Sequence, residues 1–106
     1  MQKIEYVKKD KEEFIAYYYA LKSDYDNISD FVIEVNKETG VNLNISSLRK
    51  MNNTIPQEEL FCFLSDSKIA NDKIINIVGI ELDWNLSELV IETVGFYILR
   101  IWEVTA

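Results

Sequence analysis

The chain contains no histidine, and this absence narrows its possible chemistry sharply. Histidine is the usual general base near neutral pH and the commonest metal ligand in proteins. Without it, the chain cannot build a Ser-His-Asp or Cys-His nucleophile, or a zinc site from His and Cys. Any catalysis would have to use Asp, Glu, Tyr, the lone Cys or backbone groups. We therefore expect no metal site.

Cysteine and long hydrophobic runs are also scarce. The single cysteine, Cys62, excludes an internal disulfide, and its neighbours Phe61 and Phe63 predict a buried thiol. No apolar run reaches the ~18–20 residues that a membrane helix needs. Residues 1–6 lack the hydrophobic region of a signal peptide. We therefore expect a cytoplasmic protein that makes no contact with a membrane.

Basic residues are in the minority, with 11 Lys and Arg against 18 Asp and Glu and a net charge of −7. The acidic excess is concentrated in residues 22–39 and 58–92, which carry net charges of about −3 and −6. Such a surface repels phosphate backbones, so nucleic-acid binding is not expected. The same surface would tolerate a basic protein partner, and an acidic excess that simply keeps the protein soluble is the commoner explanation.

Length and hydrophobic pattern predict one domain over residues 1–106. The expected order is β-α-α-β-β-β, an α+β class with a mainly antiparallel sheet and two helices. Helical spacing and capping residues predict the helices, and the alternation of apolar and polar residues predicts the first strand. The predicted bounds are strands at 2–8 and 59–64 and helices at 11–23 and 28–39, the second helix with Asn27 as N-cap and Gly40 after its end.

The C-terminal third is rich in β-branched and aromatic residues, which favour strands. Residues 73–84 and 89–104 are predicted as the two arms of an antiparallel hairpin, with its turn at 85–87. The second arm is apolar on both faces, so we expect a central strand that helices cover on at least one face. Gly79 and Gly95 inside the arms indicate a bulge or a close approach of two backbones.

Acidic residues at 81, 83 and 92 fall on or beside these arms. On neighbouring strands, paired carboxylates can act as acid and base or bind a hard cation. Glu81 and Glu92 are therefore candidate catalytic residues. A solvated acidic strand face is the alternative explanation, and it is much commoner in globular proteins.

A strand, two helices, a loop and a three-stranded meander resemble the N-terminal half of the GNAT superfamily of acetyl-CoA-dependent N-acetyltransferases. The residues that carry the resemblance are Ile77–Ile80, similar to the family's "iiG-i" strand, and Trp84–Leu89 with Val94–Ile98, similar to a segment of one bacterial branch. Thr93 stands where that branch usually has His. The match covers roughly residues 3–100.

The resemblance implies that the backbone of Phe96, Tyr97, Ile98 and Leu99 lies along the acetyl-pantetheine arm of the cofactor. It also implies that the linker at residues 23–29 shapes the acceptor site. The family's Gly-rich loop for the pyrophosphate should follow this strand, and residues 99–106 contain no such loop. No cofactor is therefore expected for the chain alone, and acetyl-CoA only if another chain completes the site.

These observations lead to three hypotheses. The first is a truncated acetyltransferase-like domain, inactive by itself, whose 89–104 strand is an exposed apolar edge and forms a homo-oligomer. The second is a small acidic interaction or inhibitor protein that binds a basic surface on a protein partner. The third is a working acetyltransferase whose site a partner chain completes.

Overall fold

The computed structural model describes residues 2–7, 13–52, 55–81 and 86–104, with the backbone alone for residues 2–7 and 81. Its centre is an antiparallel sheet in the order β1-β2-β6-β5-β4-β3. The strands are β1 (Gln2–Val7), β2 (Glu13–Leu21), β3 (Arg49–Lys50), β4 (Ile74–Glu81), β5 (Leu86–Thr93) and β6 (Phe96–Val104). The sheet with its helices confirms the predicted α+β class.

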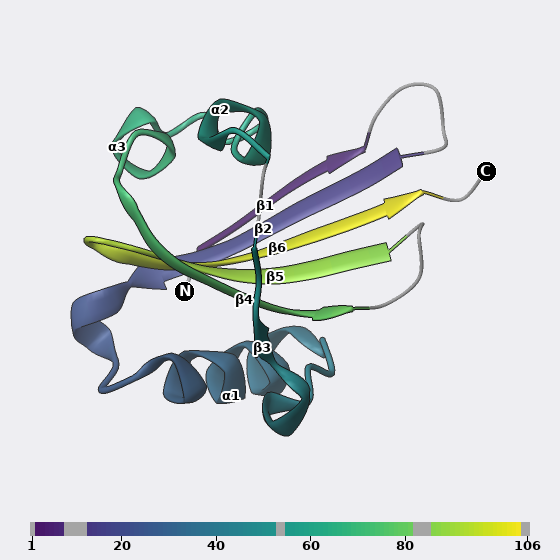
Figure 1. The fold of residues 1–106 in the computed structure, drawn as a ribbon, viewed down its shortest axis with the longest axis vertical. Coiled ribbons are helices and arrows are strands. Elements are labelled where there is room, and N and C mark those ends of the chain that lie inside the picture. The colour runs from purple at the N-terminus through teal and green to yellow at the C-terminus, as the bar shows by residue number, and fades with distance from the viewer. Residues whose placement is uncertain (1, 8–12, 53–54, 82–85, 105–106) are drawn as a thin grey trace.

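Helices cover both faces of the sheet (Figure 1). Helix α1 (Ile28–Thr39) lies on one face, and the short helices α2 (Gln57–Leu60) and α3 (Ser67–Ala70) lie on the other. Two single-turn 3-10 helices, η1 (Lys22–Asp24) and η2 (Ile45–Ser47), complete the described elements. No helix in these described ranges is long and apolar enough to cross a membrane.

Two hydrophobic clusters hold the layers together, one on each face of the sheet. The cluster under α1 is built from Ala16, Tyr18, Phe31, Val32, Val35, Leu43, Val90, Tyr97 and Leu99. The cluster under α2 and α3 is built from Ile15, Tyr17, Tyr19, Leu60, Phe61, Leu64, Ile69, Leu89, Ile91 and Ile98. Alternate residues of β2, β5 and β6 therefore enter opposite clusters, as the pleat of a strand requires.

The helix predicted at 28–39 is confirmed, and its two ends are set by local chemistry. The Asn27 side chain accepts a hydrogen bond of 3.0 Å from the backbone N–H of Asp30, which satisfies one donor of the first turn. Gly40 follows the last turn with a φ of 75°, a left-handed conformation that glycine adopts without a steric penalty.

The helix predicted at 11–23 is wrong, because residues 13–21 form strand β2. Tyr17, Tyr18 and Tyr19 alternate between the two clusters, and all three are buried. A strand that is apolar on both faces shows no polar alternation, so its apolar residues also match helical spacing. Pairing with β1 and β6 along both edges outweighs that local preference.

The strand predicted at 59–64 is also wrong. Pro56 precedes helix α2, and Glu58 and Glu59 occupy its first turn, which is a typical helix start. Leu60 and Phe61 then turn inward onto the sheet. Cys62 is exposed beside them, which corrects the prediction of a buried thiol, because the chain turns here instead of extending as a strand.

The arm predicted at 89–104 is two strands, β5 and β6, which form a hairpin around Val94 and Gly95. The prediction of a central strand covered by helices is confirmed, since β6 pairs with both β2 and β5. The premise of an exposed edge is corrected, because β5 and β6 both have neighbours on each side. Residues 89–104 therefore offer no open strand edge with which a second copy could pair. The oligomeric state stays a prediction.

Gly79 shows the close backbone approach that its position in a strand predicted. A Cβ atom at Gly79 would lie 2.8 Å from the carbonyl oxygen of Glu88 and 2.8 Å from Cδ2 of Leu89. The predicted turn at 85–87 falls partly on residues outside the described part of the chain, and Leu86 and Ser87 already belong to β5.

Candidate functional site

The candidate carboxylates Glu81 and Glu92 are not brought together. In the β4–β5 ladder Glu81 is opposite Ser87, whereas Glu92 is opposite Asn76. Ser87 and Glu92 are five positions apart on β5, which is roughly 17 Å along the strand. Glu92 instead pairs with Lys22, with 2.5 Å between Oε2 and Nζ. Asp83 lies outside the described residues.

The backbone proposed to hold a cofactor is paired on both sides. Along one edge Phe96, Tyr97, Ile98 and Leu99 match residues of β2, from Leu21 to Tyr18. Along the other edge Tyr97 to Leu99 match residues of β5. Both edges of this strand are therefore occupied by sheet partners, and no open edge remains for a pantetheine arm to pair with.

The described residues contain no group of three or more Cys, Asp or Glu side chains that could hold a metal ion.

Two exposed apolar side chains mark one end of the sheet. Leu21 ends β2 and is 51% exposed, and Val94 lies in the β5–β6 turn and is 57% exposed. A backbone hydrogen bond of 2.9 Å from Lys22 N–H to the Gly95 carbonyl brings the two segments together. We call this region, with the exposed carboxylates of Asp24, Asp26 and Asp66, the Leu21–Val94 surface.

Two cavities open on either side of Leu21. The first, the Tyr19 cavity, has a volume of about 350 Å³ and contains Asp24, Asp66 and Phe96 in its lining. The second, the Tyr97 cavity, has a volume of about 480 Å³ and is lined in part by Asp26 and Val94. Each cavity therefore combines an aromatic wall with at least one carboxylate.

Each cavity is also lined by a tyrosine whose hydroxyl group has no hydrogen-bond partner among residues 13–52, 55–81 and 86–104. Tyr19 is 7% exposed and Tyr97 is 5% exposed. Burial, followed by the negative charge of Asp66, raises the pKa of Tyr19. Burial, followed by the charge of Glu92, raises the pKa of Tyr97. Both hydroxyls therefore stay protonated, and each can accept a hydrogen bond from a donor that enters its cavity.

Local hydrogen bonds hold the Leu21–Val94 surface in place. The Asp72 carboxylate accepts hydrogen bonds from Gly95 N–H at 2.7 Å and from the Thr93 hydroxyl at 2.8 Å, which fixes the β5–β6 turn. These bonds hold the pKa of Asp72 below its ordinary value. Asp66 begins α3 as its N-cap, because its Oδ1 accepts the backbone N–H of Lys68 at 3.0 Å.

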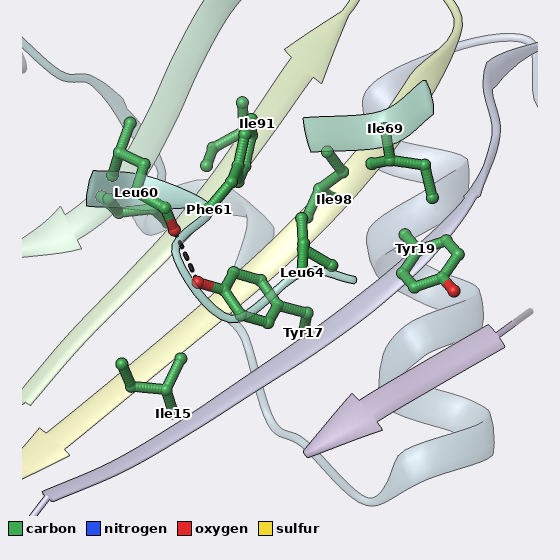
Figure 2. Close-up of a cluster of buried hydrophobic side chains, with 10 residues drawn as sticks. Ile15, Tyr17, Tyr19, Leu60, Phe61, Leu64, Ile69, Ile91 and Ile98 are labelled. Atoms are coloured by element: carbon green, nitrogen blue, oxygen red, sulfur yellow. Dashed lines mark hydrogen bonds between the residues drawn. The ribbon is translucent and has the colours of Figure 1, made fainter. Parts of the chain in front are cut away.

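A second polar group anchors α2 to the sheet. The Leu60 carbonyl accepts a hydrogen bond of 2.6 Å from the Tyr17 hydroxyl and one of 3.2 Å from Arg100 Nε (Figure 2 shows the first). Burial is the largest influence on Tyr17 and raises its pKa. Arg100 also lines a cavity of about 490 Å³, together with the exposed Cys62. The two hydrogen bonds to the Leu60 carbonyl explain why the polar groups of Tyr17 and Arg100 are buried here.

The sequence predicted acidic segments at 22–39 and 58–92 but not their contact. Asp24 and Asp26 belong to the first segment and Asp66 to the second, and the fold places all three around Leu21. The signal in the sequence was the uneven charge alone. The two apolar residues at the centre of this surface carried no signal, because a single exposed Leu or Val is ordinary.

Comparison with known proteins finds no family model, no curated protein and no solved structure that matches this chain. The resemblance to the acetyltransferase superfamily therefore stays a prediction from the sequence.

Proposed function

We propose that this protein is an acidic interaction module that binds a basic surface of a protein partner through the Leu21–Val94 surface. The observation that carries the proposal is the arrangement of two half-exposed apolar side chains among three exposed aspartates. Lys22 lies at the same end of the sheet, but Glu92 already pairs with it. The carboxylates of this surface therefore remain available to a cation from outside the chain.

The arrangement matches the anatomy of protein interfaces, in which an apolar centre is surrounded by a polar rim. The carboxylates would speed the encounter with a basic partner and select its orientation. Leu21 and Val94 would supply affinity through burial of apolar area, at about 25 cal/mol per Å². A standard interface covers about 800 Å² on each partner. The contact would therefore extend past these residues to Asp30 on α1, whose charge already acts on Tyr97.

Acetyl transfer is less well supported by the geometry. The backbone of β6 that the cofactor would need is paired with β2 and β5. Glu81 and Glu92, the candidate bases, occupy opposite ends of the β4–β5 ladder, and Glu92 is engaged by Lys22.

A defined basic peptide tests the proposal. The probe is a short fluorescein-labelled peptide of repeating Lys-Leu-Gly triplets, and the readout is fluorescence anisotropy at low and at physiological salt. We expect saturable binding that weakens as salt screens the carboxylates. The same peptide with Glu in place of Lys should not bind.

Matched double variants locate the contact. Leu21→Ser with Val94→Ser should weaken peptide binding about tenfold, since two half-exposed apolar groups are lost from the contact. The control is Ile33→Ser with Ile75→Ser, because these residues are 54% and 56% exposed on α1 and β4 and lie outside the Leu21–Val94 surface. Equal affinity of the two double variants, with circular dichroism showing that both are folded, would refute the proposed surface. So would the absence of saturable binding to the wild-type protein.

A further inference from the structure

The Tyr19 cavity is large enough to hold one amino-acid side chain of a binding partner. Its volume of about 350 Å³ lies near the lower end of the range for small-molecule pockets, roughly 300–1,000 Å³. It opens beside Leu21, at the centre of the proposed contact, so a partner that covers Leu21 also covers the mouth of the cavity. A cavity of this size suits one long side chain of that partner.

The lining of the cavity fits a long cationic side chain. Leu21 and the almost fully buried Ile69 offer apolar surface to an aliphatic stem. The aromatic rings of Tyr19 and Phe96 also line the cavity, and the face of an aromatic ring attracts a cation. The carboxylates of Asp24 and Asp66 supply two negative charges to the same cavity.

The Tyr19 hydroxyl is an independent indication of a ligand. Its side chain is more than nine-tenths buried and lines the cavity, yet the hydroxyl makes no hydrogen bond to another described residue. In Figure 2 no dashed line joins the Tyr19 hydroxyl to a drawn residue, whereas one joins the Tyr17 hydroxyl to the Leu60 carbonyl. The hydroxyl oxygen itself reaches water, because the described residues contain no fully buried side-chain oxygen or nitrogen that lacks a partner. A donor that enters the cavity can therefore replace water at this oxygen.

Asp66 completes the set of acceptors. Its Oδ1 caps α3 by accepting the Lys68 N–H, and its Oδ2 makes no hydrogen bond to the part of the chain that the structure describes. The cap fixes the orientation of the carboxylate, which limits the entropy lost when a ligand binds. Hydrogen bonds from an ammonium or a guanidinium to an ionised carboxylate are among the stronger ones in proteins.

We propose that the Tyr19 cavity receives a single lysine or arginine side chain of the partner, with its cationic head bonded to Asp66 and the Tyr19 hydroxyl. This inference rests on the proposed function, and it names the chemical group that the partner inserts. The cationic head would sit between the carboxylates, and the stem would pack against Leu21 and Ile69.

Three blocked amino acids test the inference by chemical-shift mapping in ¹⁵N-labelled protein. The probes are the N-acetyl methylamides of lysine, arginine and norleucine, the last having a similar stem without the charge. We expect the lysine or arginine probe to cause saturable shifts at Tyr19, Asp66 and Ile69, and the norleucine probe to cause none. The comparison of lysine with arginine decides which cation the cavity prefers. Equal shifts from norleucine and both cations, or no saturable shift from either cation, would overturn the inference.

Point variants then separate the cavity from general electrostatics. Asp66→Asn should weaken binding of the cationic probe about threefold, and Tyr19→Phe about fivefold. The control Glu103→Gln removes the same charge near the far end of β6 and should leave binding unchanged. Equal effects of Asp66→Asn and Glu103→Gln would show a nonspecific charge effect and refute the cavity site.

The two proposals can fail separately. If the Lys-Leu-Gly peptide binds the Leu21–Val94 surface and Tyr19→Phe and Asp66→Asn do not change its affinity, the cavity inference is wrong and the proposed function stands. If the cationic probes saturate the cavity while the peptide fails to bind, the proposed function is wrong and the cation site stands.

Discussion

Tyr17 and Tyr19 form a natural matched pair for testing how α2 is held to the sheet. Both lie on β2, face the same hydrophobic cluster and are more than nine-tenths buried. The Tyr17 hydroxyl donates a hydrogen bond of 2.6 Å to the Leu60 carbonyl (Figure 2), whereas the Tyr19 hydroxyl has no hydrogen-bond partner among the described residues. Replacing each by phenylalanine removes one oxygen from the same side of the same strand, so the difference between the variants isolates the hydrogen bond.

The expected loss for Tyr17→Phe is about 1–1.5 kcal/mol of unfolding free energy. A net intramolecular hydrogen bond contributes roughly 0.5–1.5 kcal/mol, and this one is short and buried. Arg100 Nε still donates to the Leu60 carbonyl at 3.2 Å, so the acceptor is not left unpaired, and the larger penalty of an orphaned group is avoided. Tyr19→Phe removes no hydrogen bond and should change stability by less than about 0.5 kcal/mol.

Urea denaturation followed by tryptophan fluorescence measures both variants. We expect a lower midpoint with an unchanged m-value for Tyr17→Phe, and a thermal midpoint lower by roughly 4–8 °C per kcal/mol in a domain of this size. The reasoning would be refuted if Tyr17→Phe matched the wild type or if Tyr19→Phe lost as much stability as Tyr17→Phe.

Three further changes test the turn, the strand interior and the helix cap. Asp72→Asn should destabilise the protein at neutral pH, because the carboxylate holds Gly95 N–H. Because folding lowers the pKa of Asp72 from its ordinary value near 3.8, this stabilisation is present above that value and is lost as pH falls through the folded pKa. Gly79→Ala should cost about 1–3 kcal/mol, since its Cβ would lie 2.8 Å from the Glu88 carbonyl oxygen. Asn27→Ala should cost about 1 kcal/mol through loss of the α1 cap.

The contradicting results are distinct for each change. For Asp72→Asn, a difference from wild type that stays constant from neutral pH to strong acid would show that the lowered pKa makes no contribution. For Gly79→Ala, unchanged stability in urea would mean that the β4–β5 ladder relaxes around the added methyl group. For Asn27→Ala, an unchanged urea midpoint would show that the first-turn donors of α1 find other partners; Asn42→Ala, at an exposed loop position, is the control.

The sequence by itself determined the features that depend on neighbouring residues. Helix α1 was predicted over its whole length, because Asn27 supplies the cap and Gly40 the left-handed residue within the same short stretch. The α+β class followed from the alternation of apolar patterns, and the absence of histidine excluded whole classes of site.

Only the tertiary structure decided which segments pair and what gathers at the end of the sheet. The sequence of β2 alone matches a helical pattern. It forms a strand because β1 and β6 pair with its two edges and helices cover both faces of the sheet. The carboxylates around Leu21 come from segments some forty residues apart, and the bond from Lys22 to Gly95 joins more distant segments still. Capping and turn chemistry act over a few bonds, so a sequence records them directly. Strand pairing and cavity formation depend on contacts between distant residues, and those exist only once the chain has folded.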